Sequence, residues 1–199
     1  GEIGDLNQGN TLTFGFPHMG GTSDEWFLSD FLVAWMMNPA VTQIPDAHFL
    51  NEARYQGATV AVVDPIYSAT AIHSDLWLPI QPGTDAALAL AVARHIWDTG
   101  RIDTAYVRKQ TDLPFLVRTD TGRFLRGEDL VVGGSSQRLY WWSTAENAPE
   151  AAPGCEGADS ARLSLDGREP PLEGRWDVRL RDGKTVTVTT VGSMLRREL

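Results

Sequence analysis

The sequence predicts an α/β protein: a doubly wound, mostly parallel sheet with flanking helices, followed by a C-terminal β-hairpin. Unbroken apolar runs at residues 31–37 and 58–63 are typical of strands buried on both faces. Helical patterns follow these runs, and such strand–helix alternation is expected of a parallel sheet. The hairpin is indicated by Asp182-Gly183 between two alternating stretches, which favours a two-residue type I′ turn.

The elements around the first strand begin and end at recognisable signals. Thr22 and Glu25 fit a capping box, which predicts a short helix that ends near Ser29. Pro45 fits the first position of the next helix, expected over residues 46–56. The predicted order is therefore a strand over residues 31–37, a helix over 46–56 and a second strand over 58–63.

A third short apolar piece, residues 76–80, precedes a loop at residues 82–85 and an alanine- and leucine-rich helix over residues 86–97. Thr84 fits the N-cap of this helix, and Gly100 fits the position just after its end. This segment therefore supplies one more strand–helix unit.

Polar residues follow the ends of the predicted strands. Asn38 and Asp64 come directly after two of the apolar runs, and Gly83 with Asp85 leads into the following helix. Because the carboxyl ends of parallel strands meet at one edge of an open sheet, this edge is where nucleotides bind. A plain β–α packing unit without a ligand is the alternative.

The second half of the chain is less regular. A helix is expected over residues 102–111 with Tyr106 and Val107 facing inward, then a short strand over residues 114–118. Residues 123–126 are expected to return as its hairpin partner, with both arginines on a solvated face.

Residues 133–171 form a loop-rich stretch of Gly, Pro, Ser and acidic residues, interrupted by the aromatic run 139–142. Adjacent tryptophans in such a run either form a binding platform or pack the loop onto the domain, and we favour packing. We therefore expect an α/β domain over residues 1–132, a loop-rich insertion over 133–171, and a hairpin with the start of a helix over 172–199.

Composition excludes several classes of protein. The 199 residues carry a formal net charge of −9, which argues against nucleic-acid binding and against binding to anionic membranes. Cys155 is the only cysteine, so the chain forms no internal disulfide, Cys-rich zinc site or self-contained iron–sulfur site. No apolar run approaches the ~20 residues that a transmembrane helix needs.

Several stretches together resemble one family, the catalytic subunits of molybdopterin oxidoreductases of the dimethyl-sulfoxide-reductase superfamily. Residues 110–125 (QTDLPFLVRTDTGRFL) are similar to the branch that holds nitrate, selenate and chlorate reductases, dimethyl sulfide dehydrogenase and ethylbenzene dehydrogenase. The superfamily stretches are residues 46–49 (DAHF), 52–58 (EARYQGA), 75–79 (DLWLP) and 82–90 (PGTDAALAL).

This resemblance implies a bis(molybdopterin guanine dinucleotide) cofactor with molybdenum. Carried over to this chain, it implies that Asn38 contacts the cofactor, that Asp64 contacts the nucleotide, and that Gly83 and Asp85 contact the guanine. The residue types agree, because a carboxylate can accept both N–H groups of a guanine edge and glycine lets a ligand approach the backbone. Many relatives have Arg two residues after the acid where this chain has Ile66, so no side-chain cation is supplied to the phosphates there.

The resemblance also singles out Asp5 in the glycine-rich loop of residues 1–21 as a molybdenum ligand and therefore as the catalytic residue. A high-valent, oxophilic metal suits a carboxylate better than the thioether of Met19. A solvated loop aspartate is the alternative for Asp5. His18 is a weaker candidate for the substrate cleft.

The implied function is two-electron oxygen-atom transfer or hydroxylation of a small-molecule substrate, with electrons passed to iron–sulfur centres outside this chain. The implied partners are the remainder of a catalytic subunit, of which this chain looks like a segment, and an iron–sulfur electron-transfer subunit. We expect no direct membrane insertion, and a location in the bacterial periplasm, which is favoured, or at the cytoplasmic face of the inner membrane. The alternative from another class is a non-catalytic nucleotide-binding or protein-interaction module.

Overall fold

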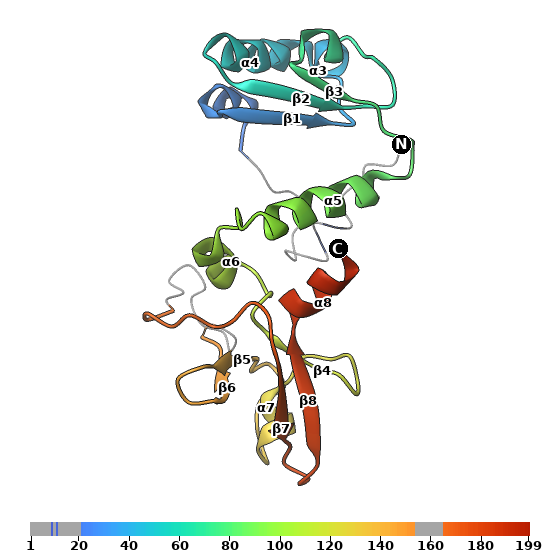
Figure 1. Cartoon of the computed structure of the whole chain (residues 1–199). Coiled ribbons are helices and arrows are strands. Elements are labelled where there is room, and N and C mark those ends of the chain that lie inside the picture. The colour runs from blue at the N-terminus through green and yellow to red at the C-terminus, as the bar shows by residue number, and fades with distance from the viewer. Residues whose placement is uncertain (1–8, 10, 12–20, 154–164) are drawn as a thin grey trace. The chain divides into compact units, whose positions relative to one another are not determined.

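The computed structural model describes residues 9, 11, 21–153 and 165–199 (Figure 1). The chain divides into two compact units, residues 1–86 and 87–199. Within the described part of the chain, no helix is long and apolar enough to cross a membrane.

The first unit contains a three-stranded parallel sheet with β2 at its centre. Its register aligns the last residues of the three strands, since Trp35 pairs with Val63 and Val63 pairs with Leu78. Figure 1 shows α3 and α4 along one face of this sheet. The elements of the unit are η1 (Ser23–Leu28), β1 (Phe31–Trp35), α3 (Pro39–Thr42), α4 (Ile44–Tyr55), β2 (Thr59–Val63), η2 (Ala71–His73) and β3 (Leu76–Leu78).

The α/β class and the parallel sheet confirm the prediction, and β2 shows why the pattern predicts it. Every residue of β2 except Thr59 is buried, and Val60 and Val62 are fully so. A run of β-branched apolar residues that is covered on both faces is characteristic of a central parallel strand.

The prediction that residues 31–37 form a strand buried on both faces is wrong. In β1 the exposed fraction of Phe31 is 58% and that of Val33 is 45%, so one face of the strand is open. The strand also ends at Trp35, because Met36 has a φ of +53° and leaves the extended conformation.

Two predicted helix starts also differ from the structure. The first helix is a 3-10 helix, and the Thr22 side chain makes no capping hydrogen bond, so the predicted capping box is wrong. The next helix begins at Ile44 with Pro45 in its first turn and ends at Tyr55. Gly57 follows with a φ of +102°, a conformation that favours glycine.

The second unit is built on an antiparallel sheet of order β4-β8-β7 beside a two-stranded pair, β5-β6. Helix α5 begins at Asp85 in the first unit, and none of its residues is buried. The elements are α5 (Asp85–Asp98), α6 (Thr104–Gln110), β4 (Leu116–Arg118), α7 (Gly127–Leu130), β5 (Tyr140–Ser143), β6 (Ala148–Ala151), β7 (Arg175–Arg179), β8 (Thr185–Thr190) and α8 (Val191–Glu198).

The aromatic run packs as we favoured from the sequence. Trp141 and Trp142 are buried, and the ring of Trp142 stacks on Trp176 with 4.7 Å between centroids. Leu116 and Leu125 are completely buried in the same cluster. By contrast, the side chain of Tyr106 in α6 is 62% exposed, so the prediction that it faces inward is wrong.

The predicted β-hairpin is present, but its turn is different. Of the two central residues only Gly183 has a positive φ, +84°, whereas a type I′ turn requires both. The backbone N–H of Gly183 donates to Leu180, and that of Leu180 donates to Lys184. The loop is therefore longer than two residues, with glycine at its left-handed position.

Candidate functional site

The carboxyl edge of the parallel sheet carries the polar residues that the sequence predicts. Asp64 directly follows β2, Asn38 follows β1, and the loop with Gly83 and Asp85 follows β3. Since the strands are parallel and their ends are in register, these segments leave the sheet at one edge. This edge is the candidate site.

Asn38 is held by a residue from the next crossover. Its Oδ1 accepts hydrogen bonds from the backbone N–H of Thr70 at 3.2 Å and from the Thr70 hydroxyl at 2.7 Å. Thr70 is 2% exposed, and its Oγ1 also accepts from the N–H of Ala40 at 3.1 Å. These bonds fix the carboxamide oxygen as the acceptor, and the Asn38 NH₂ group has no partner within residues 21–153 and 165–199. Asn38 can therefore donate to a ligand.

Asp64 is fixed at the end of the central strand. Its Oδ1 accepts from the N–H of Ile66 at 3.0 Å, a local turn that aspartate favours, and its backbone carbonyl accepts from the indole of Trp77 at 2.9 Å. The residue is 9% exposed. Its Oδ2 has no partner in the described part of the chain, so one carboxylate oxygen stays free.

Asp85 is held by the end of the first strand. The indole N–H of Trp35 donates to its Oδ1 at 2.7 Å, across 50 residues of sequence. The nearby Gly83 has a φ of +86°, and a Cβ added there would meet nothing within 4 Å. Glycine at this position therefore serves the backbone conformation and leaves open space above the loop.

The two units differ in charge. Residues 1–86 contain ten carboxylates and one cationic side chain, Arg54, so they carry the whole formal net charge of −9. Residues 87–199 contain sixteen carboxylates and sixteen lysines or arginines. Any anion at the candidate site thus meets a unit with a single cation.

Arg54 already pairs with a carboxylate away from the candidate site. Arg54 Nε donates to Asp75 at 2.9 Å, and Asp75 precedes β3, at the opposite edge of the sheet from Asp64. The backbone N–H of Val60, and next the Arg54 guanidinium, hold the pKa of the Asp75 carboxyl below its ordinary value. The residues of the candidate edge fit the nucleoside end of a cofactor, which offers N–H and O–H donors, better than its phosphates.

Four residues that the sequence singles out lie outside the described residues: Asp5, His18, Met19 and Cys155. Among the residues that the structure describes, no group of three or more His, Cys, Asp or Glu side chains could hold a metal ion. The role of Asp5 as a metal ligand and catalytic residue stays a prediction.

Sequence reasoning missed Trp35 and Thr70, which hold two of the predicted residues. The sequence pattern places Trp35 in an apolar strand, and it places Thr70 in a loop. The available signal is that a tryptophan at a strand end needs a partner for its N–H group, although the sequence does not identify that partner.

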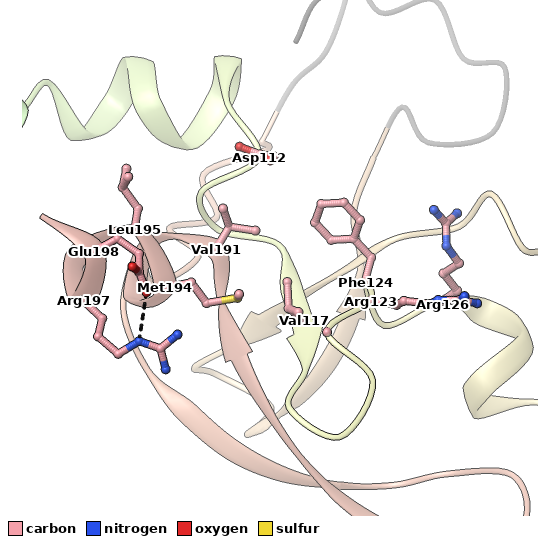
Figure 2. Close-up of a pocket in the computed structure, with 11 residues that line it drawn as sticks. Asp112, Val117, Arg123, Phe124, Arg126, Val191, Met194, Leu195, Arg197 and Glu198 are labelled. Atoms are coloured by element: carbon pink, nitrogen blue, oxygen red, sulfur yellow. Dashed lines mark hydrogen bonds and ion pairs between the residues drawn. The ribbon is translucent and has the colours of Figure 1, made fainter. Parts of the chain in front are cut away.

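The second unit has a hollow of its own, about 720 Å³ in volume (Figure 2). Val117, Phe124 and Met194 form an apolar part of its lining. Arg123 also lines it and is exposed, as we expected, whereas Arg126 is half-buried and donates to the carbonyl of Ser136. The hollow contains none of the predicted cofactor residues.

A parallel sheet with a carboxylate, a carboxamide and a glycine loop at its carboxyl edge is the arrangement in which open α/β sheets bind their ligands. The chain belongs to the molybdopterin oxidoreductase family, whose model matches residues 4–187. This match confirms the resemblance seen in the sequence. The family implies a molybdenum–molybdopterin cofactor.

Similar proteins are alpha subunits of enzymes from the predicted branch. The chain is 41% identical over 99% of its length to the dimethylsulfide dehydrogenase subunit alpha of Rhodovulum sulfidophilum, and 42% identical over 89% to the chlorate reductase subunit alpha of Ideonella dechloratans. It is 39% identical over 98% of its length to the respiratory nitrate reductase subunit alpha of Haloferax mediterranei. The chain spans 21%, 19% and 21% of these relatives, respectively.

Proposed function

We propose that this chain is the part of a molybdenum oxidoreductase that holds the nucleotide end of a bis(molybdopterin guanine dinucleotide) cofactor. Asn38, Asp64, Gly83 and Asp85 contact the nucleotide, and Asp5 ligates the molybdenum. The observation that carries the proposal is the placement of Asn38, Asp64 and the Gly83–Asp85 loop after the carboxyl ends of three parallel strands in register.

The donor and acceptor groups support guanine as the base. A guanine edge presents adjacent N–H donors, and a carboxylate offers two acceptor oxygens. Asp85 has one oxygen bound by a neutral indole and a second without a partner among the described residues. The same edge offers the Asn38 NH₂ group as a donor to an oxygen of the nucleotide. These residues bind and orient the cofactor.

The first unit offers the phosphates no unpaired cationic side chain. Arg54, the only cation of residues 1–86, is paired with Asp75 at the other edge of the sheet. Two phosphate charges beside a unit of net charge −9 are therefore neutralised by other parts of the protein. We infer that the side chains of the first unit bind the nucleoside. Backbone N–H groups and residues beyond 86 bind the pyrophosphate.

The activity we propose is two-electron oxygen-atom transfer or hydroxylation, with electrons passed to iron–sulfur centres in the remainder of the subunit and in a partner subunit. When bound, the cofactor supplies the redox chemistry, and the protein supplies binding, orientation and electrostatics. The relatives are named as a dehydrogenase and as reductases, so the proposal covers both directions.

Metal and nucleotide analysis of the natively expressed protein tests this function. Denaturation should release molybdenum, pterin and about two guanine nucleotides per metal, since the protein holds the intact cofactor. Protein that contains neither molybdenum nor guanine nucleotide would contradict the proposal and favour a non-catalytic nucleotide-binding or interaction module.

The Asp5 assignment has its own test. Asp5→Ala should lower molybdenum content or turnover by at least about tenfold, because a hard metal loses a carboxylate ligand. Guanine nucleotide bound per protein is measured in the same samples. Asp24→Ala, at an exposed carboxylate of η1, is the matched control. Unchanged molybdenum and turnover in Asp5→Ala would make Asp5 a solvated loop residue.

A further inference from the structure

Among the described residues, most side-chain bonds to aspartates come from arginines, whereas the donors to Asp85 and Asp177 are the neutral side chains of Trp35 and Thr187. The bond from Trp35 to Asp85 is short, 2.7 Å, and joins the last residue of β1 to the first residue of α5. An indole N–H only donates and carries no charge. It can fix the direction of a carboxylate without neutralising it, as an arginine would.

The backbone conformation around Trp35 places its side chain at the carboxyl edge of the sheet, near Asp85. Trp35 pairs in register with Val63, the residue before Asp64, so its side chain starts at the carboxyl edge of the sheet. Directly after it, Met36 adopts a φ of +53° and its N–H donates to the Val63 carbonyl at 2.9 Å. A non-glycine residue in the left-handed region costs free energy, and such residues concentrate at functional sites.

We propose that Trp35 is a positioning residue that orients the Asp85 carboxylate for guanine. With Oδ1 fixed by the indole N–H, the remaining lone pairs of Oδ1 and both of Oδ2 stay in place to accept the two adjacent N–H groups of the base. A carboxylate that rotates freely would have to be ordered when the nucleotide binds, which weakens binding. This inference rests on the proposed contact between Asp85 and guanine.

The test is the rate at which the purified native protein loses its guanine-containing cofactor, measured by separating protein from released cofactor over time and quantifying the guanine nucleotide that stays with the protein. Trp35→Phe should lose it about tenfold faster, since a hydrogen bond to a charged group is worth roughly 1.5 kcal/mol. Trp97→Phe is the matched control, because the Trp97 indole also donates to a carboxylate, Glu173, at 2.8 Å in the second unit. It should lose nucleotide at the wild-type rate.

A double variant distinguishes positioning from a general packing role. If Trp35 acts through Asp85, then Trp35→Phe added to Asp85→Ala should not raise the loss rate beyond that of Asp85→Ala. Additive effects would overturn the positioning role, as would wild-type retention in Trp35→Phe. Wild-type retention in Asp85→Ala would instead overturn the guanine contact itself.

A substitution without a packing change covers the case in which Trp35→Phe does not fold. Benzothienylalanine at position 35 keeps the shape of the side chain but replaces the N–H group by sulfur. The same tenfold faster loss of nucleotide is expected, on the same hydrogen-bond argument. Wild-type retention with this residue would show that the N–H group has no positioning role.

Discussion

The two units of this chain use their carboxylates in different ways. In the second unit several acidic side chains pair with arginines, which makes these carboxylates structural, although Glu173 and Asp177 accept from the neutral side chains of Trp97 and Thr187. Examples of these ion pairs are Asp98 with Arg94 and Arg196, Asp120 and Asp129 with Arg118, Glu150 with Arg168, and Glu169 with Arg108. In the first unit only Asp75 has an arginine partner in the described part of the chain, whereas Asp64 and Asp85 accept from neutral N–H groups.

This difference indicates which carboxylates are available to a ligand. The guanidinium of Arg118 holds the pKa of the Asp120 carboxyl below its ordinary value, and Arg94 does the same for Asp98. Such a pair satisfies both charge and hydrogen bonding within the protein. A carboxylate held by a backbone or indole N–H has no neighbouring cation to offset its charge and retains free lone pairs, so it can accept from a donor-rich base.

The largest effect on stability is expected in the core of the second unit. Leu125 is completely buried, and Leu125→Ala should lower the free energy of unfolding by about 2–5 kcal/mol because it leaves a cavity. Urea unfolding measures the loss, and Val132→Ala, at a side chain 90% exposed, is the control. Guanine nucleotide per folded molecule should not change. A parallel loss of nucleotide would show that the units do not act separately.

A smaller effect concerns Asp75, which pairs with Arg54 in the described part of the first unit. The pKa of Asp75 is lowered in the folded state, so its stabilisation is present above its ordinary value of 3.8 and is lost as pH falls through the lower folded value. Asp75→Asn should therefore be less stable than wild type at pH 6, and the difference should shrink near pH 3.

Thermal unfolding across this pH range measures the difference. Glu52→Gln removes an exposed charge of the same sign and controls for relief of repulsion within a unit of net charge −9. A constant difference between wild type and Asp75→Asn from pH 6 to pH 3 would contradict the role of the Arg54 and Val60 contacts.

The sequence was sufficient to predict the parts of the fold that local pattern determines. The β-branched run of β2 and the polar residue that follows it predicted a central parallel strand and Asp64 at its end. The boundaries expected near residues 132 and 171 stay predictions, as do the nucleotide roles of Asn38, Asp64, Gly83 and Asp85.

The remainder depends on contacts between distant residues, which no local pattern contains. The unbroken run shows that residues 31–37 are apolar, but it does not show which face of the strand another element covers. The exposure of Phe31 and Val33 was therefore not predicted. The bond from Trp35 to Asp85 crosses 50 residues, and that from Thr70 to Asn38 crosses 32. The turn at Asp182-Gly183 differs because loop length depends on the pairing of Leu180 with Lys184.

The most direct test of the account compares the rate at which guanine nucleotide is lost per protein molecule in Asp85→Asn and Asp120→Asn of the native protein. Both variants neutralise one aspartate, but Asp85 is held by an indole and Asp120 by Arg118. Asp85→Asn should lose nucleotide about tenfold faster than wild type, because one acceptor oxygen becomes a donor. Asp120→Asn should lose stability and keep its nucleotide. Equal retention in the two variants would contradict the assignment of the guanine contact to the first unit.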